Sequence, residues 1–269
     1  MDKLYEAKNY ISNIIKEFKP ETGIILGSGL GALPEDYDCI KISYSDIPNF
    51  QKSSVEGHKG QLCFCEIEGK KVVMMQGRYH YYEGYSMEQI TFPVKVLKLL
   101  GIKTLIITNA SGTVNSNFTP GDIMLINDHI NLMGSNPLIG KNNTELGVRF
   151  PDMSEVYNKR LRDIVLSIGK RENITLKEGI YLAMSGPSYE TPSEVGMAKI
   201  LGADVIGMST APEAIVANYC GISVIGLSCI TNYAAGVSDS KLAHNEVIET
   251  ANKIEAKFKN LIKAIIREI

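Results

Sequence analysis

The sequence has no large excess of charge of either sign. Its 28 lysines and arginines nearly balance its 30 aspartates and glutamates, which leaves a formal net charge of −2. Nucleic acids and anionic membranes bind surfaces on which positive charge is concentrated. We therefore expect neither a nucleic acid nor a membrane as a partner.

Paired cysteines and long apolar runs are also missing. The five cysteines are an odd number, and none lies in a C-x-x-C motif or at the Cys/His spacing of a zinc site. No stretch approaches the about 20 apolar residues of a membrane span, and the first residues interleave charges, unlike a signal peptide. We expect a cytoplasmic protein with reduced thiols.

Short apolar runs, partly β-branched, alternate with stretches of helical periodicity, a pattern typical of an α/β layered fold. The runs predict strands at 22–26, 71–75, 104–108, 123–126, 179–184, 204–207 and 223–228. The periodic stretches predict helices at 3–18, 87–100, 154–170, 193–201, 212–219 and 241–269. The segments 33–60 and 133–152 read as irregular. No linker or repeat divides the chain, so we expect one domain, residues 1–269, with helices flanking a central mixed sheet.

A glycine-rich turn follows the first predicted strand. Its sequence, Gly27-Ser28-Gly29-Leu30-Gly31, has the spacing G-x-G-x-G, which is neither a dinucleotide fingerprint nor a nucleoside triphosphate loop. Small residues there would let backbone N–H groups and the Ser28 hydroxyl approach an anion. A tight turn without a ligand is the alternative.

The next predicted strand ends in an unusually dense polar segment, residues 76–84. Arg78 can grip a phosphate through two parallel N–H bonds, His80 points the same way in extended backbone, and Glu83 would hold either cation in place. A surface loop with an exposed ion pair is the alternative.

Small hydrogen-bonding residues follow three further predicted strands, at 108–112, 207–210 and 231–233. Ser209 and Thr210 precede a predicted helix, so they serve either a ligand or a helix N-cap, and Asn232 is either a ligand contact or a turn residue. In the segment 184–192, Tyr189 offers a face for stacking on a base and Glu190 an acceptor for a ring N–H. Alternatively, Glu190 only complements a helix dipole.

Taken together, these motifs resemble a known family, the trimeric purine nucleoside phosphorylases of the nucleoside phosphorylase superfamily. The matching blocks follow the family's order over nearly the whole chain. They include the glycine turn and the segments 57–58, 77–84, 109–110, 128–131, 149–151, 186–191, 207–213, 231–232 and 243–244.

The resemblance implies reversible phosphorolysis in purine salvage. A 6-oxopurine ribonucleoside or deoxyribonucleoside, such as inosine or guanosine, would react with phosphate to give the free base and (deoxy)ribose 1-phosphate. The family needs no metal or redox cofactor, and inorganic phosphate is its co-substrate. A homotrimer is expected.

The resemblance also implies roles for particular residues, carried over motif by motif. Phosphate would be held by Ser28, His58, Arg78, His80, the backbone N–H of Ala110, and Ser209. The nucleoside would contact Tyr82, Tyr189, Glu190, Met208, Asn232, His244 and, from a neighbouring subunit, Phe150. The catalytic residues would be Asn232, Glu190 and His80. His129, although it lies in a family block, reads as a structural histidine.

Two other functions stay open. Methylthioadenosine phosphorylases share the fold, but they carry aspartate where this chain has Asn232 and lack the segment 186–191. The second open function is that of a nucleoside-binding protein without catalytic turnover. The absence of Arg78, His80 or Asn232 would favour it, but all three are present. Tyr233, Tyr189 and Ser111 depart from the pattern of many relatives, at positions near the base or the phosphate.

Overall fold

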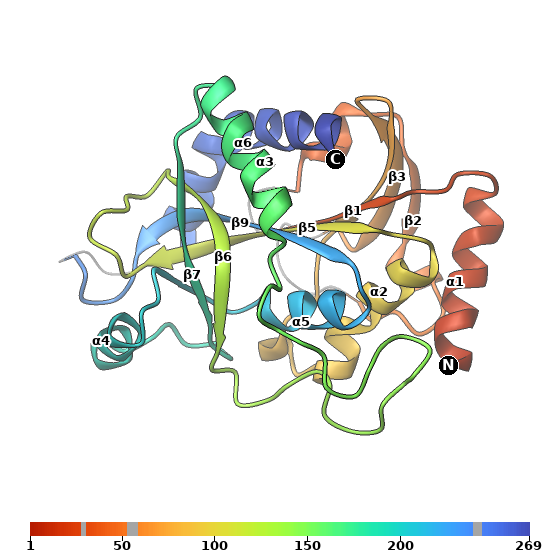
Figure 1. Cartoon of the computed structure of the whole chain (residues 1–269), viewed down its shortest axis with the longest axis horizontal. Helices are drawn as coiled ribbons and strands as arrows, with labels where there is room; N and C mark the ends of the chain where they lie inside the picture. Colours follow the sequence, from red (N-terminus) through yellow and green to blue (C-terminus); the bar gives the residue numbers. More distant parts are fainter. Residues whose placement is uncertain (28–30, 53–58, 239–243) are drawn as a thin grey trace.

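A mixed β-sheet runs through the centre of the molecule (Figure 1). The computed structural model describes residues 1–27, 31–52, 59–238 and 244–269. Within these ranges the sheet has nine strands: β1 (Thr22–Leu26), β2 (Ile40–Ser43), β3 (Gln61–Ile67), β4 (Lys70–Gln76), β5 (Thr104–Thr113), β6 (Ile123–Asn131), β7 (Leu176–Ala183), β8 (Val205–Gly207) and β9 (Ser223–Tyr233).

The strand order makes half of the sheet close on itself. The order is β2-β3-β4-β1-β5-β8-β7-β6-β9, and β9 returns to pair with β5. β1 lies parallel to both β4 and β5, and β5 lies parallel to β9, whereas β8 is antiparallel to β5 and β6 to β9. The predicted mixed sheet is therefore confirmed, and the carboxyl ends of β1, β4, β5 and β9 point toward the same edge.

Helices cover both faces of this sheet, as predicted. One hydrophobic core joins the sheet to α1 (Asp2–Ile15), α2 (Met87–Leu99) and α5 (Ala211–Tyr219), and a second joins it to α3 (Lys159–Arg171) and α6 (His244–Glu268). A third, smaller core lies under α4 (Pro192–Ile200). In Figure 1, α3 and α6 lie above the strands and α2 and α5 below them.

The local sequence explains why these elements form. Every residue of β1 is buried, which suits an apolar strand covered by helices on both faces. In α6, Ala251, Phe258 and Leu261 recur at helical spacing and face the second core. The Ser86 hydroxyl accepts from the backbone N–H of Gln89 in a capping box that begins α2.

Several predicted boundaries were wrong. Strands β5 and β9 continue well past the predicted ends because they pair with each other along their whole length. β6 also continues past its predicted end, because it pairs with β7 as far as Asn131. The segment 33–60 contains the edge strand β2, and β3, which pairs with β2 on one side and β4 on the other, was missed. Pairing with neighbouring strands, rather than alternation in the sequence, defines both. The helix predicted from residue 154 begins at Lys159, where the Asn158 side chain accepts from the Leu161 N–H.

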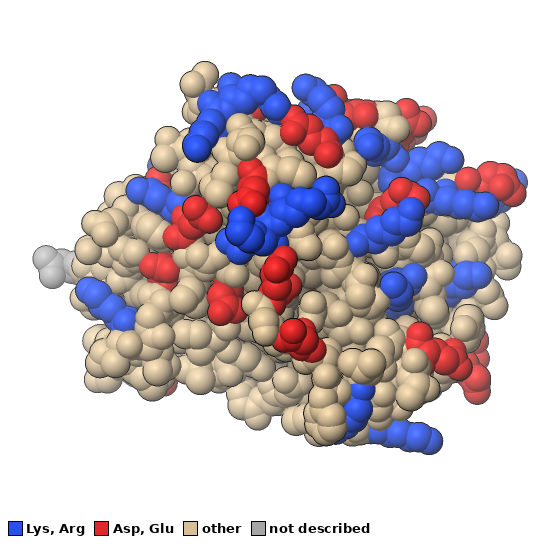
Figure 2. Space-filling view, viewed as in Figure 1, with Lys and Arg blue, Asp and Glu red and all other residues tan. Residues whose placement is uncertain are grey.

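Lysine, arginine and acidic side chains are interspersed over the face shown in Figure 2. Many of them form exposed ion pairs, such as Lys159 with Asp163. Among the described residues, no helix is long and apolar enough to cross a membrane.

Candidate active site

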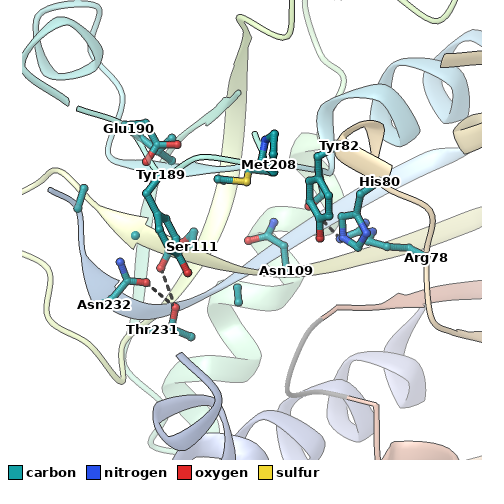
Figure 3. Close-up of a pocket in the computed structure, with 17 residues that line it drawn as sticks. Arg78, His80, Tyr82, Asn109, Ser111, Tyr189, Glu190, Met208, Thr231 and Asn232 are labelled. Atoms are coloured by element: carbon teal, nitrogen blue, oxygen red, sulfur yellow. Dashed lines mark hydrogen bonds between the residues drawn. The ribbon is translucent and has the colours of Figure 1, made fainter. Parts of the chain in front are cut away.

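A cavity of about 400 Å³ opens where the carboxyl-terminal halves of β5 and β9 meet β8. This volume falls in the range of sites for small organic ligands. The residues that line it are Arg78, His80, Tyr82, Asn109, Ala110, Ser111, Gly112, Pro187, Tyr189, Glu190, Ile206, Gly207, Met208, Ser209, Thr231, Asn232 and Ala234. Figure 3 shows Arg78, His80 and Tyr82 at one end, and Tyr189, Glu190 and Asn232 at the other.

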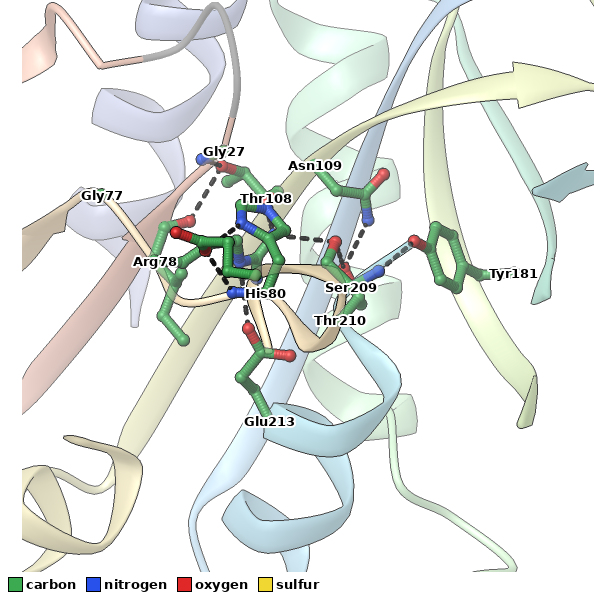
Figure 4. A network of polar contacts seen from close by, with 12 residues as sticks. Gly27, Gly77, Arg78, His80, Thr108, Asn109, Tyr181, Ser209, Thr210 and Glu213 are labelled. Carbon is green, nitrogen blue, oxygen red and sulfur yellow. Dashed lines mark hydrogen bonds and ion pairs between the residues drawn. The ribbon is translucent and has the colours of Figure 1, made fainter. Parts of the chain in front are cut away.

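Arg78 is buried and held from two sides at the first end. Its Nε donates to Glu213 Oε1 at 2.9 Å, and its Nη1 donates to the Thr108 carbonyl at 2.9 Å and to Ser209 Oγ at 3.1 Å (Figure 4). Only 2% of Arg78 and 4% of Glu213 are exposed, so the ion pair lies in a medium of low dielectric. Such a guanidinium is fixed in direction and suited to binding an anion.

The hypothesis that Glu83 holds either cation was right for His80 only. Glu83 accepts from the His80 backbone N–H at 2.7 Å and contacts the ring Nδ1 at 3.1 Å, within the turn Tyr81–Glu83. Arg78 instead pairs with Glu213, in the first turn of α5, which the sequence analysis missed. The only signal was its place in the block 207–213, four positions after Ser209.

Burial lowers the pKa of the His80 ring, against the opposing effect of its hydrogen bond to Glu83. A carboxylate can only accept, so the proton of the neutral ring lies on Nδ1 and Nε2 carries none. The ring stacks on Tyr82, with centroids 4.6 Å apart and planes 17° apart. His80 is therefore held in one tautomer and one orientation.

Ser209 and Thr210 precede α5, but the Thr210 side chain does not cap the helix. Thr210 has φ of +69°, a conformation that is rare for a β-branched residue, and its hydroxyl accepts instead from Asn109 Nδ2 at 2.9 Å. The Ser209 backbone N–H donates to the Tyr181 hydroxyl at 3.2 Å. Thr210 thus occupies the N-cap position of α5, as the N-cap interpretation has it, but its side chain belongs to the pocket's polar network and makes no cap hydrogen bond.

Asn232 lies at the second end, where the register of β5 and β9 shifts between Ser111 and Gly112. Its Oδ1 accepts from the Thr231 hydroxyl at 2.9 Å, and its Nδ2 donates one proton to the Tyr233 carbonyl at 2.9 Å. A Cβ on Gly112 would stand only 2.9 Å from Nδ2. Glycine at this bulge therefore leaves the room that the Asn232 amide occupies.

Glu190 faces the pocket, while another residue complements the helix behind it. The capping box of α4 is formed by Thr191 and Glu194, so the dipole interpretation of Glu190 is not needed. Burial raises the pKa of the Glu190 carboxyl, which makes its carboxylate a stronger hydrogen-bond acceptor. Tyr189 stands beside it, 41% exposed.

The other predicted residues are either outside the described residues or outside the pocket lining. Ser28 and His58 are outside the described residues, as is the side chain of His244, the residue at which α6 begins. Phe150 is 87% exposed and does not line the pocket. His129 contacts the buried Tyr157 hydroxyl through Nδ1 at 3.1 Å and is also outside the pocket lining, as expected of a structural histidine.

The glycine turn begins beside the pocket's Arg78 end. The Gly27 N–H donates to Thr108 Oγ1 at 2.9 Å, and a Cβ on Gly27 would come within 2.6 Å of the Thr108 carbonyl. That carbonyl also accepts from Arg78. Close packing of the β1 end against β5 thus requires glycine here.

The family model of the phosphorylase superfamily matches residues 21–267. Purine nucleoside phosphorylase 1 of Geobacillus stearothermophilus is 56% identical over 251 residues, which cover 93% of this chain and 92% of the relative. The protein of the same name from Bacillus subtilis (strain 168) is 51% identical over 268 residues, 99% of this chain and 98% of the relative. The crystal structure of Schistosoma mansoni purine nucleoside phosphorylase in complex with inosine superimposes on this chain with a TM-score of 0.95 at 38% sequence identity. The match covers 100% of this chain and 97% of that one. The crystal structure of the same enzyme in complex with adenosine gives the same TM-score.

Proposed function

Because the chain belongs to the phosphorylase superfamily, and within it to the purine nucleoside phosphorylases, we propose that its pocket cleaves 6-oxopurine nucleosides such as inosine and guanosine with phosphate. The products are the free base and ribose 1-phosphate, or deoxyribose 1-phosphate from a deoxyribonucleoside. One observation carries this proposal: the cavity has a buried guanidinium at one end and a carboxylate with a raised pKa beside an aromatic ring at the other.

Phosphate binds at the Arg78 end. Arg78, His80, Ala110 and Ser209 line the cavity, and by the family pattern the backbone N–H of Ala110 donates to the phosphate. Ser28 and His58 complete this set by the family pattern. The reaction needs no metal or redox cofactor in this proposal, because the phosphate itself is the nucleophile and the base is the leaving group.

The nucleoside occupies the rest of the cavity. Tyr82 and Met208 lie against the ribose, with His244 added from the family pattern, and Tyr189 stacks on the purine. Glu190 accepts from N1–H of a 6-oxopurine. Adenine has no proton on N1, so its lone pair would face the carboxylate.

Charge develops in opposite senses as the glycosidic bond breaks. The C1′–N9 electron pair goes to the purine, while the sugar becomes oxocarbenium-like and forms a new C1′–O bond with phosphate. The anionic phosphate held by Arg78 stabilises the sugar cation, and proximity lowers the barrier further. The second proton on Asn232 Nδ2 is donated to N7, a bond that strengthens as N7 gains negative charge and so raises turnover.

The alternative of a methylthioadenosine phosphorylase is disfavoured by the pocket's purine end. An amide at position 232 and a carboxylate at Glu190 match a 6-oxopurine with a proton on N1. A binding protein without turnover is disfavoured by the fixed guanidinium and histidine at the opposite end. The free thiols of all five cysteines, each within the described ranges, support the proposed cytoplasmic location.

Phosphate dependence tests the proposed reaction directly. Release of hypoxanthine from inosine is expected with phosphate and is expected to fall below detection in a phosphate-free buffer. The assay follows base release from inosine, guanosine, adenosine, xanthosine and methylthioadenosine with and without phosphate. Equal cleavage of inosine in both buffers would indicate a hydrolase, and methylthioadenosine as the best substrate would favour the alternative enzyme.

We also propose a homotrimer in which Phe150 covers the ribose in a neighbouring subunit's pocket. Phe150 is 87% exposed, which is unusual for a large aromatic side chain. The variant Phe150→Ala is expected to lose about tenfold or more in kcat/KM for inosine, since the site opens to water. Light scattering on the parent is expected to give three chains per particle.

Subunit mixing separates this role from a role within one chain. Phe150→Ala and Arg78→Gln protomers are each expected to be poorly active alone. Refolded together, they are expected to regain activity, because an Arg78→Gln neighbour supplies Phe150 to an intact pocket. A fully active monomer at assay concentration, or no recovery on mixing, would contradict the proposal.

A further inference from the structure

Beneath the pocket, a chain of hydrogen bonds runs from the phosphate end to the purine end. It passes from Ser209 through Thr210, Asn109 and Ser228 to Ser111 (Figure 4 shows its first members). Thr210, Asn109 and Ser228 are at most 1% exposed. Water cannot exchange freely with these groups, so each proton in the chain must be accounted for.

The chain's first half directs a proton toward the phosphate site. Asn109 Nδ2 donates to Thr210 Oγ1 at 2.9 Å, so the Thr210 proton is not drawn to Asn109 and can be given to Ser209 Oγ, 3.2 Å away. Ser209 also accepts from Arg78. With both lone pairs of Ser209 occupied by these donors, its own proton is available for an oxygen of a bound phosphate.

The second half fixes the orientation of the Asn109 amide. Ser228 Oγ lies 2.6 Å from Asn109 Oδ1, an oxygen that can only accept, so Ser228 donates. Ser228 has one proton, and therefore the 2.6 Å bond to Ser111 is donated by Ser111. Ser111 then presents lone pairs, and no proton, to the purine end.

An amide turned by 180° would reverse this chain. Asn109 Oδ1 would then take the proton of Thr210, and Ser209 would turn its own proton toward Thr210 rather than toward the pocket. A phosphate oxygen would meet a lone pair of Ser209 in place of a donor. One buried amide thus decides whether Ser209 can donate to the phosphate.

We propose that Asn109 and Ser228 are positioning residues for phosphate, which through Thr210 hold the Ser209 hydroxyl as a donor toward the phosphate site. The proposal rests on the proposed function. Ser228 does not line the pocket, so it acts only through its neighbours. The positioning role also explains why Thr210 keeps its unfavourable backbone conformation, because that conformation brings the Thr210 hydroxyl to Asn109.

The variant Ser228→Ala tests this role. Without the donor at Asn109 Oδ1 the amide is no longer held in one orientation, so KM for phosphate is expected to rise about tenfold. The same change removes the acceptor of the Ser111 hydroxyl at the purine end. The proposed base contacts there are Tyr189, Glu190 and Asn232, so KM for inosine at saturating phosphate is expected to stay within about threefold. Calorimetry with inorganic phosphate alone gives an independent measure of the same loss.

Two further variants control for packing. Thr91→Val removes another buried hydroxyl, which donates to the Met87 carbonyl inside α2, and is expected to lower Tm without raising KM for phosphate. Ser228→Cys roughly keeps the side-chain volume and a weak hydrogen-bond donor, so an intermediate KM for phosphate is expected. If Ser228→Ala does not fold, Ser228→Cys takes its place in the test.

The outcomes separate the two levels of the proposal. A KM for phosphate within twofold of the parent in Ser228→Ala, or equal rises in KM for both substrates, would overturn the positioning role. A parent that releases base without phosphate would instead contradict the proposed function. A selective rise in KM for phosphate that Ser228→Cys partly restores supports the inference.

Discussion

Arg78→Gln is expected to lower kcat/KM for phosphate by about a hundredfold to a thousandfold, the effect typical of losing a preorganised charge-stabilising group. Arg78 carries the positive charge of the phosphate end and is 2% exposed, so its attraction for an anion is weakly screened. The measurement is the initial rate of base release from inosine as phosphate is varied.

The partner of Arg78 complicates this variant, and a second one resolves it. Removing the guanidinium leaves Glu213 buried without its positive partner, which costs about 3–5 kcal/mol of stability. In Arg78→Gln/Glu213→Gln the charges are removed together, so Tm is expected to recover while the loss in kcat/KM stays. Arg160→Gln, on the exposed side of α3, serves as the matched control. A folded double variant with parental kcat/KM for phosphate would show that Arg78 does not bind it.

Asn232→Asp is expected to reduce the preference for inosine over adenosine by about ten- to a hundredfold, which corresponds to about 1–3 kcal/mol. The amide donates to N7, whereas an aspartate can only accept unless protonated and repels O6 of a 6-oxopurine. A 6-amino group, by contrast, can donate to the new carboxylate. The measurement is the ratio of kcat/KM for inosine to kcat/KM for adenosine in parent and variant.

The surroundings of Asn232 sharpen this experiment. Its Nδ2 donates to the Tyr233 carbonyl at 2.9 Å, so a carboxylate oxygen in its place would also face a backbone carbonyl. Some loss of Tm is therefore expected, and the inosine-to-adenosine ratio is the informative quantity because a general loss of folded protein cancels from it. Asn117→Asp makes the same chemical change at an exposed position in the β5–β6 connection. An unchanged ratio in Asn232→Asp would leave Glu190 as the residue that reads the base.

The sequence alone determined which chemistry each end of the pocket offers. Arg78 and His80 lie two positions apart after one strand, and Tyr189 and Glu190 are adjacent before one helix. Both groupings are local, so they can be recognised from the sequence. The apolar runs and helical stripes predicted the α/β layers for the same reason, since periodicity is a property of neighbouring residues.

Only the tertiary structure decided how these groups are held. Arg78 pairs with Glu213, 135 positions away, rather than with Glu83 five positions away, because the carboxyl end of β4 meets the first turn of α5. The bonds from Asn109 and Ser111 to Ser228 span 119 and 117 positions and exist because β5 and β9 lie side by side in register up to the bulge at Ser111/Gly112. Strand pairing and register depend on the packing of the whole sheet, so no local sequence pattern predicts which distant hydroxyl or carboxylate completes the site.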